Sequence, residues 1–216
     1  MATPARSIHK IGRRRVIGSF ASAKMREMVE WESQIERDFL YHLEFDHDVI
    51  RYVSQPIKFR FSQDNKYHYH YPDFEIFRHS TPKRKFIEIK PYHITLKPEF
   101  IEKTEAIKAK MFSDGFDYAV ITDNEIRIEP ILSNLKLLYR YKLHEYSQAN
   151  VSKLVHALQG SGLISLTFSE LEKIAQEFSL ELIDCYSCIA NKVFDFDIKV
   201  PLTENTLLIV ADRKLR

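Results

Sequence analysis

The segment KFIEIKP at residues 85–91 decides the fold of this chain. Its pattern predicts a strand closed by a proline, and successive side chains of a strand point to opposite faces. Ile87 and Ile89 therefore face a core, whereas Glu88 and Lys90 share the other face, about 6.6 Å apart along the strand. A carboxylate and an ammonium on an otherwise apolar strand are costly unless their face is wet or binds a metal.

A second motif, YPDF at residues 71–74, comes earlier in the chain. Pro72 cannot donate a hydrogen bond to a neighbouring strand, which suits a sheet edge or a strand bend. The side chain of Asp73 is thereby expected to point out of the sheet. Together with Glu88 it would supply two carboxylates from neighbouring strands, and Mg²⁺ prefers carboxylate and water oxygens.

The two motifs together predict metal-dependent hydrolysis of a phosphodiester. A divalent metal lowers the pKa of a water and neutralises charge on the phosphorane, and a cation such as Lys90 beside that water stabilises the transition state. Each motif alone has a simpler explanation. Glu–Lys pairs two residues apart are common on solvated strands, and Pro-Asp pairs are common in turns. Their occurrence in this order within one domain favours the enzymatic interpretation.

Helices and further strands flank these motifs. Hydrophobic periodicity predicts a helix at 23–45, strands at 57–61, 67–77 and 85–90, a helix at 98–112, strands at 118–122 and 126–128, and a helix at 131–146. The first helix is inferred from a stripe of Met28, Trp31, Ile35 and Phe39. This order predicts a mixed α/β domain on a central sheet, with a right-handed parallel crossover between residues 85 and 122.

The C-terminal part predicts a second, smaller domain. The pattern weakens at residues 147–150, where we expect a boundary. A short helix then ends at Gly160, a capping box at 169–172 starts a second helix, and a third helix spans 181–192. A hairpin at 194–210 follows, and three helices with a terminal hairpin are typical of a winged-helix domain.

We therefore expect a basic N-terminal arm (residues 1–20), an α/β domain (21–146) and a winged-helix domain (151–216). Residues 1–150 have a net charge of +4, which includes the run Arg13, Arg14 and Arg15, whereas the winged-helix range has a net charge of −2. The basic surplus suits a phosphate backbone. The acidic C-terminal domain is expected to bind a protein partner at least as much as DNA.

Cysteines and hydropathy exclude other classes of protein. Cys185 and Cys188 lie three residues apart with no further Cys or His set nearby, so buried free thiols are expected rather than a zinc site. No apolar run approaches the roughly 20 residues that cross a bilayer. The first residues lack the apolar stretch of a secretory signal. The sequence therefore predicts a cytoplasmic protein without membrane contact.

Pro72-Asp73 with Glu88-Ile89-Lys90 resembles the PD-(D/E)xK nuclease superfamily, to which type II restriction enzymes belong. A longer set of segments resembles the TnsA-like transposon endonucleases within it. These segments are SQIERD (33–38), SQP (54–56), YPDF (71–74), EIKP (88–91) and PLTENT (201–206). The resemblance covers nearly the whole chain and implies a restriction-endonuclease-like N-terminal domain with a central mixed sheet, followed by a C-terminal winged-helix domain.

The resemblance also implies an activity and its partners. A TnsA-like protein is a Mg²⁺-dependent DNA endonuclease that hydrolyses the strand at the 5′ ends of a transposon. A separate DDE-type transposase cuts and joins the 3′ ends, and a regulatory ATPase belongs to the same complex. Transposon-end DNA and these two proteins are thus the expected partners.

The site residues are carried over by position. The resemblance implies that Asp73, Glu88 and the Ile89 carbonyl bind Mg²⁺, and that Lys90 lies beside the attacking water. Glu36 would complete or bridge a second metal position, so two Mg²⁺ ions, or Mn²⁺ in their place, are expected. Glu88 stands where some relatives have Gln, which strengthens the metal-site interpretation.

Some residues remain open alternatives. Glu32 lies nearer the centre of the predicted helix stripe than Glu36, although a pair with Arg26 or Arg51 would also explain it. The resemblance favours Glu36.

Other residues are weaker candidates. Lys103, Lys108 and Lys110 line either a DNA-facing helix or a merely solvated helix face, and the solvated face is the default interpretation. His68 and His70 alternate with tyrosines, which favours an exposed or DNA-facing aromatic strand over zinc binding. Gln55 either forms a hydrogen bond within the site or has only a structural role in its loop.

Two other functions compete with the transposon endonuclease. One is a free-standing PD-(D/E)xK nuclease, either a restriction enzyme or a junction-resolving enzyme. The other is a non-catalytic module that keeps the fold to bind DNA and partners. The presence of Asp73, Glu88 and Lys90 argues against the module, because an inactive relative would have lost part of this set.

Overall fold

The structure, a computed structural model, describes residues 16–211, and the chain divides into two compact units, Met1–Ile128 and Glu129–Arg216. Arg13, Arg14 and Arg15, the basic run predicted to contact DNA, lie outside the described residues. Within residues 16–211, no helix has both the length and the apolar character needed to cross a membrane.

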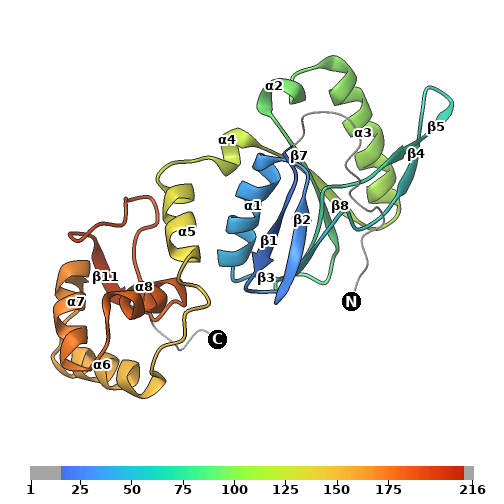
Figure 1. Ribbon diagram of the computed structural model, residues 1–216. Coiled ribbons are helices and arrows are strands. Elements are labelled where there is room, and N and C mark those ends of the chain that lie inside the picture. The colour runs from blue at the N-terminus through green and yellow to red at the C-terminus, as the bar shows by residue number, and fades with distance from the viewer. Residues whose placement is uncertain (1–15, 212–216) are drawn as a thin grey trace. The chain divides into compact units, whose positions relative to one another are not determined.

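A four-stranded mixed sheet forms the centre of the first unit (Figure 1). Its strands, in spatial order, are β3 (Val49–Ser54), β6 (Phe74–Arg78), β7 (Lys85–Lys90) and β8 (Asp117–Thr122). β6 pairs antiparallel with β3 and with β7, whereas β7 and β8 pair in parallel and are connected through α2 (Tyr92–Thr95) and α3 (Pro98–Ser113). The predicted mixed α/β domain and its parallel crossover are confirmed. β3 itself was not among the predicted strands.

The central strands carry apolar side chains on both faces of the sheet. On one face, α1 (Gln34–Phe45) packs Phe39 against Phe74 of β6, with ring centroids 5.7 Å apart. Phe74 is the register partner of Ile87 on β7, so these two side chains share that face. Ile89 follows at the next alternate position and is also buried. The predicted core side of β7 is therefore present.

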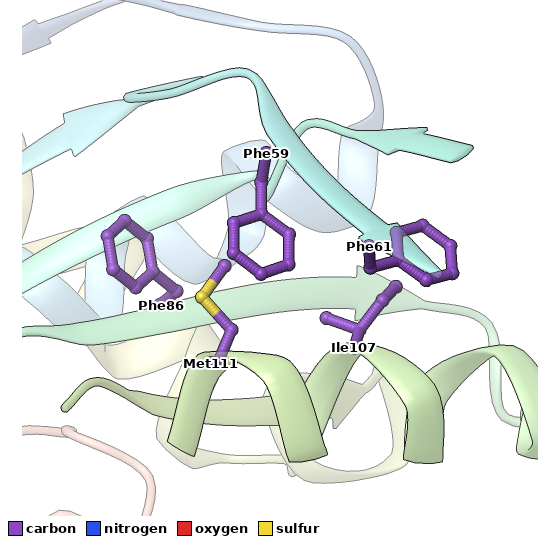
Figure 2. Close-up of a cluster of buried hydrophobic side chains, with 5 residues drawn as sticks. All are labelled: Phe59, Phe61, Phe86, Ile107 and Met111. Atoms are coloured by element: carbon purple, nitrogen blue, oxygen red, sulfur yellow. The ribbon is translucent and has the colours of Figure 1, made fainter. Parts of the chain in front are cut away.

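A separate cluster fills the opposite face and fixes a hairpin to α3 (Figure 2). The cluster consists of five buried side chains, which are Phe59 and Phe61 of β4, Phe86 of β7, and Ile107 and Met111 of α3. β4 (Phe59–Gln63) pairs antiparallel with β5 (Lys66–His70). This two-stranded sheet is distinct from the central one, and the cluster is a main contact that attaches it to α3 and β7.

The prediction of one continuous strand at 67–77 is wrong. β5 ends at His70 and β6 begins at Phe74, and Pro72 lies in the break between them. A proline cannot donate to a strand ladder. The chain therefore leaves the pairing with β4 and enters the pairing with β3 and β7 across three residues.

The prediction of a helix from residue 23 is also wrong. β1 (Gly18–Ser22) and β2 (Glu27–Trp31) form an antiparallel hairpin, and α1 begins only at Gln34. Met28, one member of the supposed helix stripe, is 61% exposed. The hairpin has tertiary support, since the Ser22 hydroxyl donates to Glu44 of α1 (2.5 Å), and such contacts override weak local helix propensity. Because β1 starts at Gly18, the predicted N-terminal arm also cannot extend to residue 20.

The compact units divide earlier than at the predicted residues 147–150. The predicted strand at 126–128 is wrong, because α4 (Asp123–Ile126), which starts with a capping box between Thr122 and Glu125, ends at Ile126, and no strand follows at 127–128. The helix expected at 131–146 is shorter, as α5 (Ile131–Tyr139). It carries the buried Leu132, Leu135 and Leu138 and contacts α8 (Leu182–Ala190). Its apolar face thus belongs to the second unit, and the polar stretch at 147–150 only begins the next helix.

The second unit contains helices and a small antiparallel sheet in the order β10-β11-β9. After α5 its elements are α6 (Gln148–Gly160), β9 (Leu166–Thr167), α7 (Phe168–Glu177), α8, β10 (Phe194–Asp195) and β11 (Leu207–Val210). The capping box that starts α7 is formed by Thr167 and Glu170 rather than at 169–172. Cys185 and Cys188 are free and buried, which confirms the prediction of structural thiols.

Replacing Met111 with alanine is expected to lower the free energy of unfolding of the first unit by about 2–5 kcal/mol, because it leaves a cavity in the cluster that holds the hairpin to α3. The neighbouring Phe112 is 76% exposed, and Phe112→Ala should change the free energy by no more than about 0.5 kcal/mol. Trp31 is the single tryptophan, so denaturant unfolding followed by its fluorescence reports on this unit. Equal losses in the two variants would contradict the described packing.

Candidate functional site

Asp73 lies in the break between β5 and β6, at the edge of the paired part of the sheet. The register of β6 with β7 ends at the Phe74–Ile87 pair. Beyond it, the Ile89 N–H donates to Asp73 Oδ2 at 2.6 Å. The Asp73 carbonyl accepts a hydrogen bond from the Gln55 N–H (2.9 Å), just after β3. Both contacts fix the carboxylate beside β7, after Pro72, where the sequence predicted either a sheet edge or a strand bend.

The Lys90 ammonium lies among three oxygen atoms. Its Nζ is 2.5 Å from Glu88 Oε1, 3.0 Å from the Ile89 carbonyl oxygen and 3.5 Å from Asp73 Oδ2. We call this arrangement the three-oxygen cage. Glu88 and Lys90 lie on the same face of β7, as alternation predicted, and the cage brings together all the residues taken from the two motifs.

Burial and mutual repulsion perturb the acids of the cage. Removal from water raises the pKa of Asp73 to about 8, the negative charge of Glu88 acts in the same direction, and Lys90 opposes this. Burial also acts to raise the pKa of Glu88, but His70 and Lys90 outweigh it, so that this pKa lies below its ordinary value. Burial acts to lower the pKa of Lys90, yet Asp73 and Glu88 outweigh it and raise the pKa. The site thus contains one ammonium, one stable carboxylate and one carboxyl group that resists ionisation.

Glu36 lies near the cage without touching the lysine. It occupies the first turn of α1, where its carboxylate accepts from the Glu32 N–H (2.8 Å) and from the Ser33 hydroxyl (2.9 Å). Burial raises its pKa, and the nearby Lys90 opposes the shift. The charge of Glu36 in turn raises the pKa of Asp73. Glu32 is only half-buried, so of the two glutamates Glu36 is the one buried towards the cage.

His70 and Tyr118 belong to the site although little in the sequence indicated them. His70 is 6% exposed, and its Nε2 is 3.2 Å from Glu88 Oε2 and 3.2 Å from the Tyr118 hydroxyl. The expectation of an exposed strand is therefore wrong for His70, the last residue of β5. The only available signal was that His70 stands three residues before Asp73. His68, by contrast, is exposed and packs its ring near Phe61.

The donor atoms of the cage fit a hard divalent cation. Two carboxylates and a backbone carbonyl are oxygen ligands of the kind that Mg²⁺ prefers, and these three groups already surround one positive charge. Glu88 Oε2 is buried and makes no hydrogen bond of good geometry, which leaves it able to accept a further partner. Among residues 16–211, no three His, Cys, Asp or Glu side chains converge as ligands, so any such site depends on the carbonyl.

The remaining candidates lie elsewhere on the first unit. Lys103, Lys108 and Lys110 are exposed on α3. Lys108 pairs with Glu105 and Lys110 with Asp114, as on an ordinary solvated helix. Gln55 is buried, and its backbone supports Asp73.

Comparison with known families assigns part of the first unit. Residues 46–123 match the family described as TnsA-like endonuclease N terminal. This span runs from the end of α1 to the start of α4, so it includes Asp73, Glu88 and Lys90, whereas Glu36 precedes it. No curated protein matches the chain.

Replacing Asp73 with asparagine is expected to stabilise the metal-free protein in a pH-dependent way. Because the folded state holds the pKa of Asp73 near 8, well above its ordinary value, the wild type loses stability as pH rises from about 4 through about 8. The asparagine cannot ionise but can still accept from the Ile89 N–H. The melting temperatures of the two proteins in EDTA should therefore differ by several degrees above pH 8, and this difference should shrink as pH falls and close near pH 4, since 1 kcal/mol corresponds to roughly 2–4 °C at this size.

The exposed Asp114→Asn change is the control and should show no such trend. A difference in melting temperature between Asp73→Asn and wild type that stays constant from pH 5 to 9 would contradict the raised pKa of Asp73.

Proposed function

We propose that this chain, which carries a TnsA-like endonuclease N-terminal domain at residues 46–123, is the DNA endonuclease subunit of a heteromeric cut-and-paste transposase in the cytoplasm. It would hydrolyse the strand at the 5′ ends of the transposon in a Mg²⁺-dependent reaction. A TnsA-like domain implies transposon DNA and a transposase as partners in general. We further propose a DDE-type transposase and a regulatory ATPase as the protein partners.

The observation that carries this proposal is the three-oxygen cage. Two carboxylates and an ammonium lie largely buried at the end of β7, and burying charged groups is unfavourable unless they are paired or bind a metal. A purely structural ion pair would need one acid. Asp73 is the surplus acid, since its pKa is raised while that of Glu88 is lowered. A second positive charge in the cage would relieve the repulsion.

Asp73, Glu88 and the Ile89 carbonyl would hold a divalent cation. When bound, the cation would lower the pKa of a water and offset negative charge on the phosphate. Lys90 would then turn from the carboxylates towards the attacking water, where an ammonium stabilises developing negative charge. Glu36, at the start of α1, would bind or bridge a second cation.

For the second unit we propose a winged-helix domain. Helix α6, strand β9, helices α7 and α8, and strands β10 and β11 follow one another in the order helix, strand, helix, helix, hairpin, and β9 pairs with β11 to complete a small sheet. This order supports the proposal. Because residues 151–216 have a net charge of −2, we propose a protein partner for this unit.

Cleavage of transposon-end duplex tests the assignment. With the partner transposase and Mg²⁺ present, Asp73→Ala and Lys90→Ala should each lower the rate of 5′-strand cleavage by at least about 100-fold. The first variant loses a ligand of the cation, and the second loses the ammonium that stabilises negative charge in the transition state. Asp114→Ala, an exposed control, should cleave like wild type, and EDTA should abolish all cleavage.

Three outcomes would overturn parts of the proposal. Full activity of Asp73→Ala would exclude the cage as the catalytic site. Efficient cutting of arbitrary DNA by the isolated chain would favour a free-standing nuclease. A wild type that never cuts within the assembled complex would favour a non-catalytic module.

His70 is expected to act as a positioning residue for Glu88. His70→Phe should lower cleavage by about 10–100-fold, as is typical when a group that orients a metal ligand is lost. The loss should be partly restored by raising the Mg²⁺ concentration, whereas the loss in Lys90→Ala should not. His68→Phe, two residues earlier on the same strand, is the matched control. Loss that no Mg²⁺ concentration restores would contradict the positioning role.

A further inference from the structure

The β4–β5 hairpin presents a cationic and aromatic outer face. Tyr67 is 71% exposed and Tyr69 is 58% exposed. Lys58 Nζ lies 4.1 Å from the centre of the Tyr69 ring, and Arg60 Cζ lies 4.6 Å from the centre of the Tyr67 ring. Lys58 and Arg60 alternate with the buried Phe59 and Phe61, so the four cationic and aromatic residues define the outer face of the hairpin.

Stability of the hairpin does not require this face. Phe59 and Phe61 on its inner side already anchor it to α3 through the buried cluster (Figure 2). Exposed aromatic side chains that lie together in one patch commonly mark interaction sites. The outer face is therefore a candidate for a partner.

The charges of the outer face are not neutralised. Neither Lys58 nor Arg60 forms an ion pair with a carboxylate among the described residues. Residues 57–71 contain three basic residues and a single acid, Asp64, which lies in the turn. An aromatic ring restrains a cation by cation–π attraction without cancelling its charge. Each cation is thus held in place with its charge available to an external anion.

The hairpin is also continuous with the three-oxygen cage. β5 ends at His70, which contacts Glu88, and Asp73 follows three residues later. Tyr69 is four residues from Asp73, a path of at most about 14 Å. That distance corresponds to about four base pairs of duplex. A partner bound to the outer face would therefore lie next to the reacting centre.

We propose that Lys58, Arg60, Tyr67 and Tyr69 form a DNA-docking ribbon that binds the phosphate backbone of duplex DNA beside the cleavage point. Lys58 and Arg60 each bind a phosphate, and the tyrosine rings hold the two cations in position. The charge complementarity with DNA and the link through His70 favour this partner, and two-stranded ribbons have the dimensions to lie in the major groove. The proposal rests on the nuclease function and adds how the substrate is held.

Salt dependence of binding tests the ribbon directly. The probe is a 30-base-pair transposon-end duplex with full-length protein in EDTA, so that no cleavage occurs. Each phosphate contact contributes about 0.9 to the slope of log affinity against log salt. The double variant Lys58→Gln/Arg60→Gln should therefore show a slope shallower by about 1.8, and its affinity at 0.1 M salt should fall roughly 10- to 100-fold.

A matched control and two tyrosine variants separate binding from stability. Arg51 lies over the Phe77 ring at 3.5 Å on β3 and β6, so Arg51→Gln removes the same kind of pair elsewhere and should leave the slope unchanged. Tyr67→Phe/Tyr69→Phe keeps both ring contacts and should bind nearly like wild type. Tyr67→Thr/Tyr69→Thr removes them and should weaken binding, with a melting temperature close to wild type.

The outcomes for the ribbon and for the nuclease are distinguishable. An unchanged salt slope in the Lys58/Arg60 variant would overturn the ribbon, even if cleavage still depends on Asp73. Weaker binding to single-stranded DNA with unchanged binding to duplex would also overturn it. A shallower slope in that variant, together with full cleavage by Asp73→Ala, would support the ribbon while refuting the proposed site.

Discussion

The Lys90 ammonium and the three oxygens around it form the interaction on which the rest of the first unit depends. Two buried acids repel each other when both are ionised, because that repulsion is poorly screened. It is relieved by a proton on one of them or by a positive charge between them. Lys90 supplies that charge from the same strand as Glu88, so alternation along β7 brings the pair together. Asp73 reaches the cage from the break between β5 and β6, so its position depends on where the strand pairing is interrupted.

Pro72 provides this interruption. It ends the ribbon of β4 and β5 and releases the chain into the central sheet, and the pairing of β6 with β7 stops at Phe74. The Ile89 N–H then lies beyond the β6 ladder and donates to Asp73. One break in the strand pattern thus positions the aspartate, satisfies a backbone donor and sets the direction of the exposed hairpin.

Local pattern predicted what depends on local geometry. The two faces of β7, the bend at Asp73 and the parallel crossover follow from alternation, from proline chemistry and from segment length. The β1–β2 hairpin was missed because its sequence also fits a helix, and contacts such as Ser22 with Glu44 decide between them. The place of α5 depended on its packing against α8, which no local pattern records. His70 was missed for the same reason, since its environment is made by Glu88 and Tyr118 from distant parts of the chain.

Glu36 on α1 has a different standing from the residues of the cage. The family match begins at residue 46, after α1 has ended, so the cage lies wholly inside the matched span and Glu36 lies outside it. Both oxygens of Glu36 accept hydrogen bonds in the first turn of α1, where a carboxylate is favoured by the helix dipole. Glu36 therefore has a structural role within α1, whereas the hydrogen bond that the Asp73 carboxylate accepts comes from Ile89, next to the cage. A second cation at Glu36 would have to compete with those hydrogen bonds, whereas a first cation in the cage would have to displace Lys90 and share Asp73 with the Ile89 N–H.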